Sequence, residues 1–188
     1  MLRIEYFDSE YSRPEPEEVL VRRAKEGSKE AFCKLYGMYK DKLYRYAYYK
    51  LGNPADAEDA VSECVLVAWK DIDKLRSDLS FSAWIFRILH NICAGVIRIQ
   101  IEEREKYGRL EDTSSGFRTV EDGTKINSSI ELAEALSHLS EDEKEVVLLS
   151  VVSGLNSSEI SMITGLTPGA ARSKLSRSYA KMREFLKS

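Results

Sequence analysis

Residues 154–183 read GLNSSEISMITGLTPGAARSKLSRSYAKMR, and this pattern predicts two short helices joined by a tight turn. Asn156 is a typical helix N-cap, and the glutamate three positions later completes a capping box. Gly165 is typical of a residue that ends a helix, while Thr167 and Pro168 are typical of the cap and first position of the next helix. Two short helices around a turn that contains glycine predict a helix-turn-helix, an element that reads DNA.

The second of these helices is predicted to have one buried face and one basic face. Its apolar side chains fall on one stripe, formed by Ala171, Leu175, Tyr179, Met182 and Leu186. Most of its basic and hydroxyl side chains fall elsewhere, and the small residues at its start allow close approach to phosphates and base edges. The candidate DNA-binding residues of this segment are Thr167, Gly169, Ala170, Arg172, Ser173, Lys174, Ser176, Arg177 and Lys181.

Charge is distributed unevenly along the chain. The 188 residues carry a formal net charge of −3, yet residues 168–188 hold six Lys and Arg against one Glu. Residues 101–167 hold six basic residues against fourteen acidic ones. The acidic stretch either screens the rest of the surface from DNA or docks a basic protein. The basic charge of the last predicted helix, taken alone, also fits a helix face that only meets solvent. The turn pattern and the small residues favour DNA binding instead.

The rest of the chain predicts an all-α fold. Segment 15–26 is a short amphipathic helix, and a second helix with apolar residues at steps of three and four ends at Leu51. The sequence LGNPADAED, residues 51–59, ends that helix and begins a third. A fourth helix is predicted from about Phe81 to beyond Arg98.

The helical pattern divides the chain into two domains, at residues 1–107 and 128–188. Residues 108–127 are rich in Gly, Ser, Thr and Asp and lack a sustained apolar period, which predicts a flexible linker. Because this linker has few apolar residues to order it, the two domains are expected to move relative to each other. A capping box at Ser140 and Glu143 begins a helix of the second domain.

Catalytic, metal and cofactor sites are not indicated. The three cysteines, Cys33, Cys64 and Cys93, lie in apolar, helix-like contexts, which favours buried free thiols. His90 and His138 are far apart in sequence, so no metal ligand cluster is expected. The sequence has no glycine-rich phosphate loop and no nucleophile arrangement. We therefore expect neither an enzyme nor a bound cofactor.

A cytoplasmic location is expected from the N-terminus and the apolar runs. The first residues are charged throughout and lack the apolar core of a signal peptide. No apolar run approaches the roughly 20 residues that span a bilayer, so we expect no membrane insertion.

Two further motifs connect the helix-turn-helix to a known family. DAEDAVSECVLVAW, residues 56–69, and FSAWIFRILHN, residues 81–91, precede it in a fixed order. Together with residues 154–183, they resemble bacterial RNA polymerase sigma factors of the extracytoplasmic-function group. The resemblance covers about residues 15–105 and 128–187, and it implies a factor that directs core polymerase to promoters and initiates transcription.

The resemblance implies a role for each domain. The first would bind the clamp helices of the largest polymerase subunit through Asp56, Glu58, Asp59 and Glu63. It would also recognise and open the promoter element near the start site through Arg76, Ser80, Arg87, His90, Asn91 and Arg98. The second would dock on the flap of the other large subunit and read the upstream element. An anti-sigma factor is a further partner implied by the group.

The acidic cluster has a second interpretation. Carboxylates in the first turns of a helix are favoured by its dipole, and this explains Asp56, Glu58 and Asp59 without a partner. It does not explain Glu63, which lies further along the helix. Ion pairing with basic clamp residues explains all four.

The chain departs from the family pattern in places. Ser62 stands where the family usually has Gln, and Gly95 where it usually has Asp. Residues 99–106, IQIEEREK, replace the usual basic run, which predicts weaker phosphate contacts in the first domain. Two alternatives stay open: a regulator that binds duplex DNA without polymerase, and a polymerase-binding adaptor that does not fully open promoters. The missing basic run favours the adaptor of these two, whereas the acidic block of the first domain is not needed by the regulator. Aromatic side chains near the fourth helix's start, at Phe81, Trp84 and Phe86, stack on bases or, more typically at this spacing, pack in the core.

Overall fold

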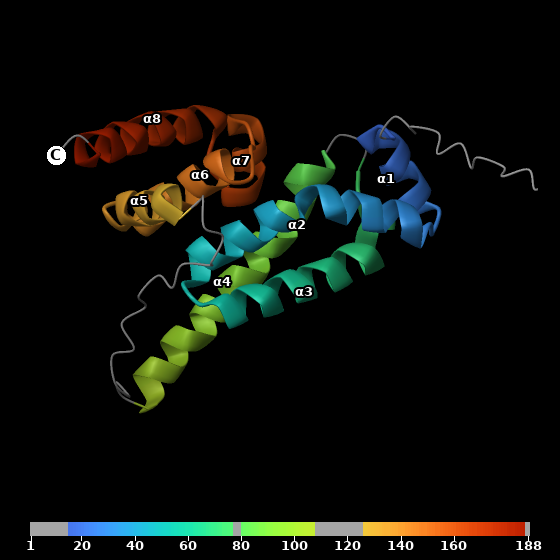
Figure 1. Ribbon diagram of the computed structural model, residues 1–188, viewed down its shortest axis with the longest axis horizontal. Helices are drawn as coiled ribbons and strands as arrows, with labels where there is room; N and C mark the ends of the chain where they lie inside the picture. Colours follow the sequence, from blue (N-terminus) through green and yellow to red (C-terminus); the bar gives the residue numbers. More distant parts are fainter. Residues whose placement is uncertain (1–14, 77–79, 108–125, 187–188) are drawn as a thin grey trace, which may run out of the picture.

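The computed structural model describes residues 15–76, 80–107 and 126–186, and these residues form helices without a strand. The all-α prediction is confirmed. Figure 1 shows the elements in chain order. They are α1 (Glu17–Lys25), α2 (Lys29–Leu51), α3 (Pro54–Asp71), the 3-10 turn η1 (Ile72–Lys74), α4 (Phe81–Tyr107), α5 (Ile126–Ser137), α6 (Glu141–Val151), α7 (Ser157–Thr164) and α8 (Pro168–Phe185).

The helix ends lie where the capping residues predict them. The Ser28 side chain accepts a hydrogen bond from the Ala31 amide at 3.3 Å and begins α2. Gly52 ends α2 with φ of 72°, a left-handed conformation that glycine adopts without steric cost. Asn53 then caps α3 by accepting a hydrogen bond from the amide of Ala55 at 2.9 Å. Because each cap depends on residues within one turn, the sequence alone locates these boundaries.

Helices α1 to α4 form the first half of the molecule, with α2 packed along both α3 and α4 (Figure 1). Its core contains the fully buried side chains of Leu35, Leu43, Tyr46, Phe86 and Leu89. The rings of Tyr46 and Phe86 meet edge to face, with centroids 5.8 Å apart. Phe81 and Phe86 are buried and Trp84 half-buried, which confirms the core interpretation for these aromatic residues.

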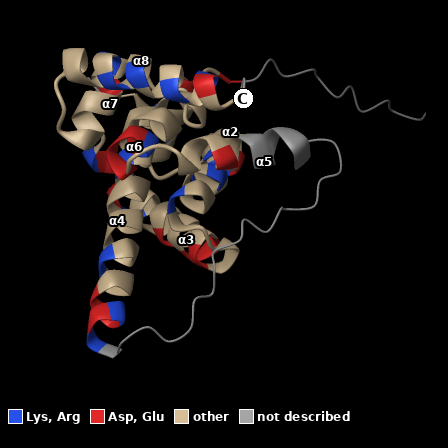
Figure 2. Ribbon diagram, turned by 90° about the vertical axis from the view of Figure 1, so that its left-hand side faces the viewer, with Lys and Arg blue, Asp and Glu red and all other residues tan. Residues whose placement is uncertain are grey.

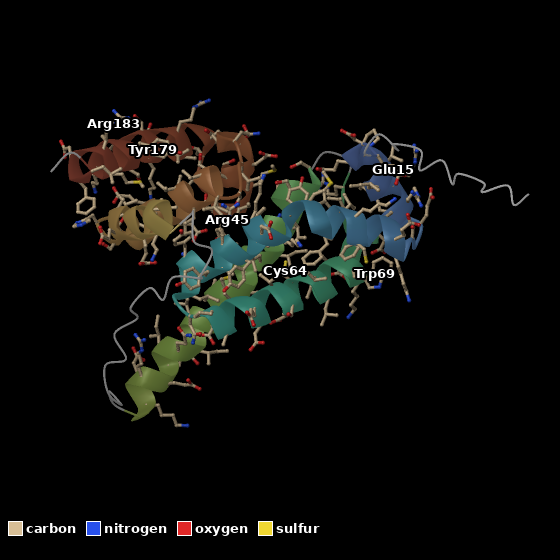
Figure 3. The ribbon with its side chains drawn as sticks, viewed as in Figure 1. Glu15, Arg45, Cys64, Trp69, Tyr179 and Arg183 are labelled. Carbon is tan, nitrogen blue, oxygen red and sulfur yellow. The ribbon has the colours of Figure 1, made fainter. Side chains whose placement is uncertain are left out.

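The cysteine prediction is correct at two positions and wrong at the third. Cys64 and Cys93 are buried, and burial raises the pKa of each thiol to about 12. Figure 3 shows Cys64 on α3. Cys33 is exposed, because it lies on the solvent side of α2 beside the buried Phe32.

Helices α5 to α8 form the second half. Five consecutive residues of α6 are buried, Glu145 to Leu149, so this helix lies at the centre of the half. The predicted capping box is present, since Ser140 and Glu143 exchange side-chain and backbone hydrogen bonds. Leu186 was predicted in the buried stripe of the last helix, but it is 57% exposed, and it lies just after α8 as the C-cap residue.

The two halves contact each other. Helix α4 packs against α7, and α2 against α6, so the buried apolar residues of both halves form one continuous cluster. The predicted linker lies almost entirely in residues 108–125, outside the described residues. Helix α5 begins at Ile126, two positions before the predicted start of the second domain at 128. The division into two domains stays a prediction.

By length and composition alone, α4 could cross a membrane, and it is the one helix of the described residues that meets this criterion. Its N-terminal part carries the core residues Ile85, Phe86 and Leu89. These pack against α2 and α3, as a central helix of a globular fold does. The C-terminal part projects beyond the body of the molecule (Figure 1).

Candidate nucleic-acid and polymerase interfaces

The predicted helix-turn-helix is formed by α7, the turn at residues 165–167, and α8. Gly165 ends α7 with φ of 73°, and Asn156 caps its start through a capping box. The Thr167 hydroxyl accepts a hydrogen bond from the Ala170 amide at 3.2 Å, with Pro168 at the first position of α8. Buried Ile160 of α7 and Ala171 of α8 belong to one apolar cluster, which fixes the angle between the helices.

The outward face of α8 carries most of the residues predicted to contact DNA. Ala171 and Ser178 are buried, and Leu175, Tyr179 and Met182 are partly buried against the core. The other side of the helix exposes Thr167, Gly169, Ala170, Arg172, Ser173, Ser176 and Arg177. Its first three turns thus present two guanidinium groups, two serine hydroxyl groups and little bulk, a composition suited to a DNA groove.

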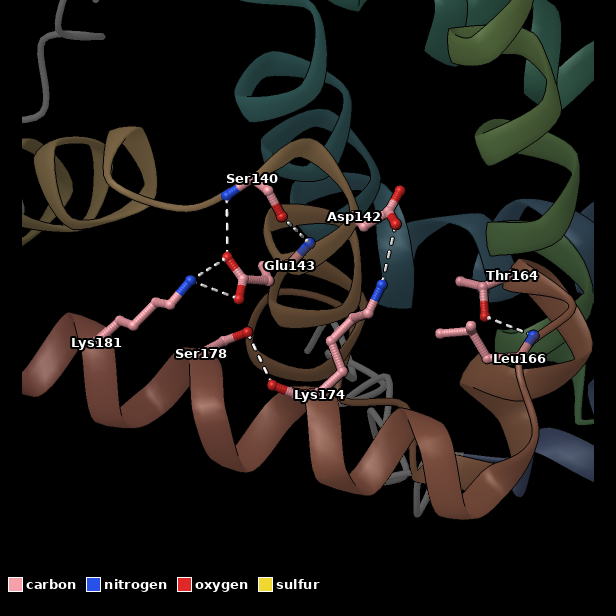
Figure 4. A network of polar contacts seen from close by, with 8 residues as sticks. All are labelled: Ser140, Asp142, Glu143, Thr164, Leu166, Lys174, Ser178 and Lys181. Carbon is pink, nitrogen blue, oxygen red and sulfur yellow. Dashed lines mark hydrogen bonds and ion pairs between the residues drawn. The ribbon is translucent and has the colours of Figure 1, made fainter.

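Lys174 and Lys181 lie apart from that outward face. Both reach the first turn of α6, where Lys174 pairs with Asp142 at 3.0 Å and Lys181 with Glu143 at 2.7 Å (Figure 4). The hydrogen bond from Lys181, together with the Ser140 amide, lowers the pKa of Glu143 to about 2. The acidic residues before α8 therefore partly serve to fix α8 on α6, an interpretation that the charge pattern alone did not suggest.

Figure 2 shows acidic residues along α3, which carries the predicted polymerase-binding residues. Glu58, Asp59 and Glu63 are exposed, whereas Asp56 is half-buried and accepts a hydrogen bond from the Gln100 side chain at 3.0 Å. On the face of Asp59 and Glu63 lies Leu66, which is 70% exposed. Acidic groups around an exposed leucine form a surface suited to a basic, partly apolar partner.

The predicted residues of the first half's DNA surface fall into two groups. Arg76, Arg87, Asn91 and Arg98 are exposed. Ser80 and His90 instead meet the second half. The Ser80 hydroxyl donates to a carboxylate oxygen of Glu159 at 2.6 Å, and Nδ1 of His90 lies 2.9 Å from Oε1 of Glu145.

Comparison with known proteins shows the family of the chain. Sigma-70 region 2 matches residues 35–98, and sigma-70 region 4 matches residues 129–182, which together make up more than half of the chain. The sigma factor BldN of Streptomyces coelicolor, an extracytoplasmic-function factor, is 31% identical over 172 residues. That match covers 89% of this chain and 64% of the length of BldN. The chain belongs to the extracytoplasmic-function sigma factors of the sigma-70 family.

Two further relatives agree with this assignment. The sigma factor CarQ of Myxococcus xanthus is 28% identical over 166 residues, which cover 88% of this chain and 95% of CarQ. The structure of RpoE from Bartonella quintana, solved in complex with the anti-sigma factor NepR, has 24% identity and a TM-score of 0.73. The match covers 83% of this chain and 96% of RpoE, so this chain shares the fold of RpoE.

One buried cluster of the sigma factor was missed by the sequence reasoning. Glu145 of α6 lies among Tyr46 and Lys50 of α2 and His90 of α4. Its side chain is only 9% exposed, and that of Lys50 only 10%. Burial raises the pKa of Glu145, but the hydrogen bond with His90 and the charge of Lys50 outweigh burial and hold it below its ordinary value. A charged residue directly before the apolar run VVLL was the available signal.

The stability of the helix-turn-helix can be tested at Leu175. We expect Leu175→Asp to lower the free energy of unfolding by about 2–4 kcal/mol, because it removes an apolar contact and places a carboxylate against the core. Urea unfolding followed by circular dichroism measures this change. Ser176→Asp introduces the same charge at the next position, which is exposed, and should change stability by less than about 0.5 kcal/mol. Equal losses for the two variants would contradict the assigned faces of α8.

Proposed function

We propose that this sigma factor divides its work between the two halves of the chain. The first half, residues 1–107, would bind the clamp helices of core polymerase through α3 and contact melted promoter DNA through α4. The second half, residues 128–188, would dock on the polymerase flap and read the upstream promoter element through α8. The observation that carries this proposal is the outward face of α8, with Arg172, Ser173 and Arg177 exposed on a correctly capped helix-turn-helix.

The chemistry proposed here is binding rather than catalysis. Promoter opening costs a few kcal/mol for each unstacked base, and contacts between the protein and the separated bases offset that cost. The polymerase supplies the reaction itself. Within the described residues, no group of three or more His, Cys, Asp or Glu side chains is placed to hold a metal ion.

A second candidate function is supported by the end of α4. Glu102, Glu103 and Glu105 are exposed where the family usually has basic side chains. These carboxylates repel phosphate, so α4 would hold melted DNA weakly. The protein would then recruit polymerase to promoters and depend on another factor, or on supercoiling, for opening.

Run-off transcription with core polymerase on a promoter library tests the main proposal and separates it from the second. Each promoter is offered as a full duplex and as a template with a pre-melted bubble at the start site. Efficient transcription from the duplex is expected of a factor that opens promoters. Transcripts only from the bubble would support the adaptor, and none from either template would contradict both proposals.

An anti-sigma factor is also proposed as a partner, because a sigma factor of this group exposes two separate binding surfaces that one inhibitor can cover. The sigma factor RpoE, which shares this fold, was crystallised with such a factor. Purification of the tagged chain from its host, with and without a competing excess of core polymerase, tests this proposal. An inhibitor should be displaced by core polymerase, since both would occupy the same surfaces.

A further inference from the structure

The two lysines of α8 that were predicted to contact DNA are both engaged within the second half. Lys174 and Lys181 are separated by about two helical turns, so they lie on one side of the helix. The Nζ atom of Lys174 lies 3.0 Å from a carboxylate oxygen of Asp142. The Nζ atom of Lys181 lies 2.7 Å and 2.9 Å from the two carboxylate oxygens of Glu143. Consecutive carboxylates in the first turn of α6 thus hold both ammonium groups (Figure 4).

The capping box of α6 fixes the Glu143 side chain independently of Lys181. Its Oε2 atom accepts a hydrogen bond from the Ser140 amide at 3.1 Å, and its side chain is only 15% exposed. An ordinary surface ion pair is weak, partly because two flexible side chains must be ordered to form it. Here the carboxylate is already ordered, so only the lysine side chain loses freedom. Lys181 is therefore held more firmly than a typical surface lysine.

The other ion pair is fixed from the lysine side. The Lys174 side chain is 20% exposed and that of Asp142 is 82% exposed, so the lysine is the covered partner. Helices α6 and α8 pack along each other, and the aliphatic stem of Lys174 lies against this contact. Arg172 and Arg177 differ from both lysines. They are exposed on the outward face, and among the described residues no carboxylate forms an ion pair with either.

Carboxylate and phosphate oxygens are both anionic acceptors, so they compete for the same ammonium groups. We propose that Asp142 and Glu143 hold Lys174 and Lys181 away from DNA phosphates, so that DNA binding by α8 depends on its outward face. This inference rests on the proposed binding of DNA by α8. A phosphate contact adds the same affinity to every sequence, and promoters compete with a large excess of other DNA. The two carboxylates would therefore limit retention of the sigma factor at sites that are not promoters.

Removal of the two carboxylate charges tests this proposal. Asp142→Asn combined with Glu143→Gln keeps the size of both side chains, and glutamine at the third helical position also completes a capping box. With the full chain, the affinity for duplex DNA should rise by about three- to tenfold on every sequence, because the released lysines reach phosphates. The slope of log affinity against log salt should become steeper by about one to two. Fluorescence anisotropy at several salt concentrations measures both quantities.

A matched control removes the same net charge elsewhere in the second half. Glu134→Gln combined with Glu141→Gln changes one exposed carboxylate on α5 and one in the first turn of α6. Neither glutamate forms an ion pair with α8 among the described residues. The control should gain less than about twofold in affinity and keep the salt slope of the parent, because it releases no lysine.

Substitution of the lysine separates its release from a change in the position of α8. In the Glu143→Gln background, Lys181→Gln should remove the gain in affinity and return the salt slope to that of the parent. In the parent chain, the same substitution should leave the salt slope unchanged, because Lys181 contacts Glu143 rather than phosphate there. A shallower slope for Lys181→Gln in the parent chain would overturn the proposal.

The preference for the upstream element distinguishes the proposal from a purely structural role. Both ion pairs also fix α8 on α6, and if that were their only role, the Asp142→Asn and Glu143→Gln variant would lose affinity and sequence preference. Either loss, or a gain no larger than that of the control, would overturn the proposal. If the variant gains affinity while neither it nor the parent prefers any upstream element, the inference stands and the proposed promoter reading by α8 fails. Absence of DNA binding by every variant at the lowest salt concentration would contradict both.

Discussion

Asp59→Lys combined with Glu63→Lys should reduce the affinity of the sigma factor for core polymerase by about tenfold or more. Both carboxylates are exposed on one face of α3, beside the exposed Leu66, and neither closes a cap or packs in the core. If this face meets the basic clamp helices of polymerase, the reversal replaces two attractive charge contacts with two repulsive ones. The fold should be unaffected, since no buried group changes.

A fluorescence titration of labelled sigma factor with core polymerase, at two salt concentrations, measures this effect. The parent affinity should fall with salt, and the variant affinity should fall less, because screening weakens repulsion as well as attraction. Glu26→Lys combined with Asp73→Lys is the matched control, because both positions are exposed and lie in the first half outside α3. An affinity of the α3 variant equal to that of the control would leave Asp59 and Glu63 as part of a solvated helix face that does not contact polymerase.

Much of the fold could be predicted from sequence because its signals are local. Ser28, Asn53 and Asn156 each bond an amide within three residues, and Gly52 and Gly165 each end a helix by their own conformation. Such signals do not depend on the rest of the molecule. The helix-turn-helix and the order of the helices in both halves were therefore accessible before any tertiary contact was known.

The contacts between distant segments could not be predicted in the same way. Tyr46 and Glu145 are separated by 99 positions, and Lys181 and Glu143 by 38, so no local pattern connects the partners. An acidic residue and a basic residue each look like solvated surface until the fold brings them together. This is why Lys174 and Lys181 were assigned to the DNA face of α8, and why Glu145 received no role.

The contact between the two halves also changes the expectation of two independent domains. The linker composition predicted freedom of movement, but the sequence contains no local sign that α4 and α7 would pack together. The polar side chains that join the two halves, Tyr46, Lys50, His90 and Glu145, lie on three different helices, so no local pattern in the sequence reveals their contact.

Arg172→Ala should flatten the preference of the sigma factor for its upstream promoter element. Arg172 lies in the second turn of α8, is exposed, and belongs to the outward face with Ser173 and Arg177. A guanidinium group that bonds both acceptors of a guanine contributes about 1–3 kcal/mol of discrimination, or about 5- to 150-fold. Loss of that group should remove sequence preference at one or two positions and weaken the best sites the most.

The effect on sequence has to be separated from the effect on charge. Arg183→Ala removes the same charge near the end of α8, where the helix has left the turn that would enter the groove. It should weaken binding to all sequences about equally, since a phosphate contact carries no sequence information. Lys181→Ala is a poorer control, because Lys181 pairs with Glu143 and its loss also loosens α8 from α6.

Binding of the full chain to a library of upstream elements, measured at two salt concentrations, tests this prediction. Arg172→Ala should change the sequence profile. If Arg172→Ala or Arg183→Ala removes one phosphate contact, the slope of log affinity against log salt should become smaller by about one for that variant. A profile for Arg172→Ala that matches the parent at both salt concentrations would remove base readout from Arg172. The outward face of α8 would then contact only the sugar-phosphate backbone of DNA, and promoter choice would have to come from the first half.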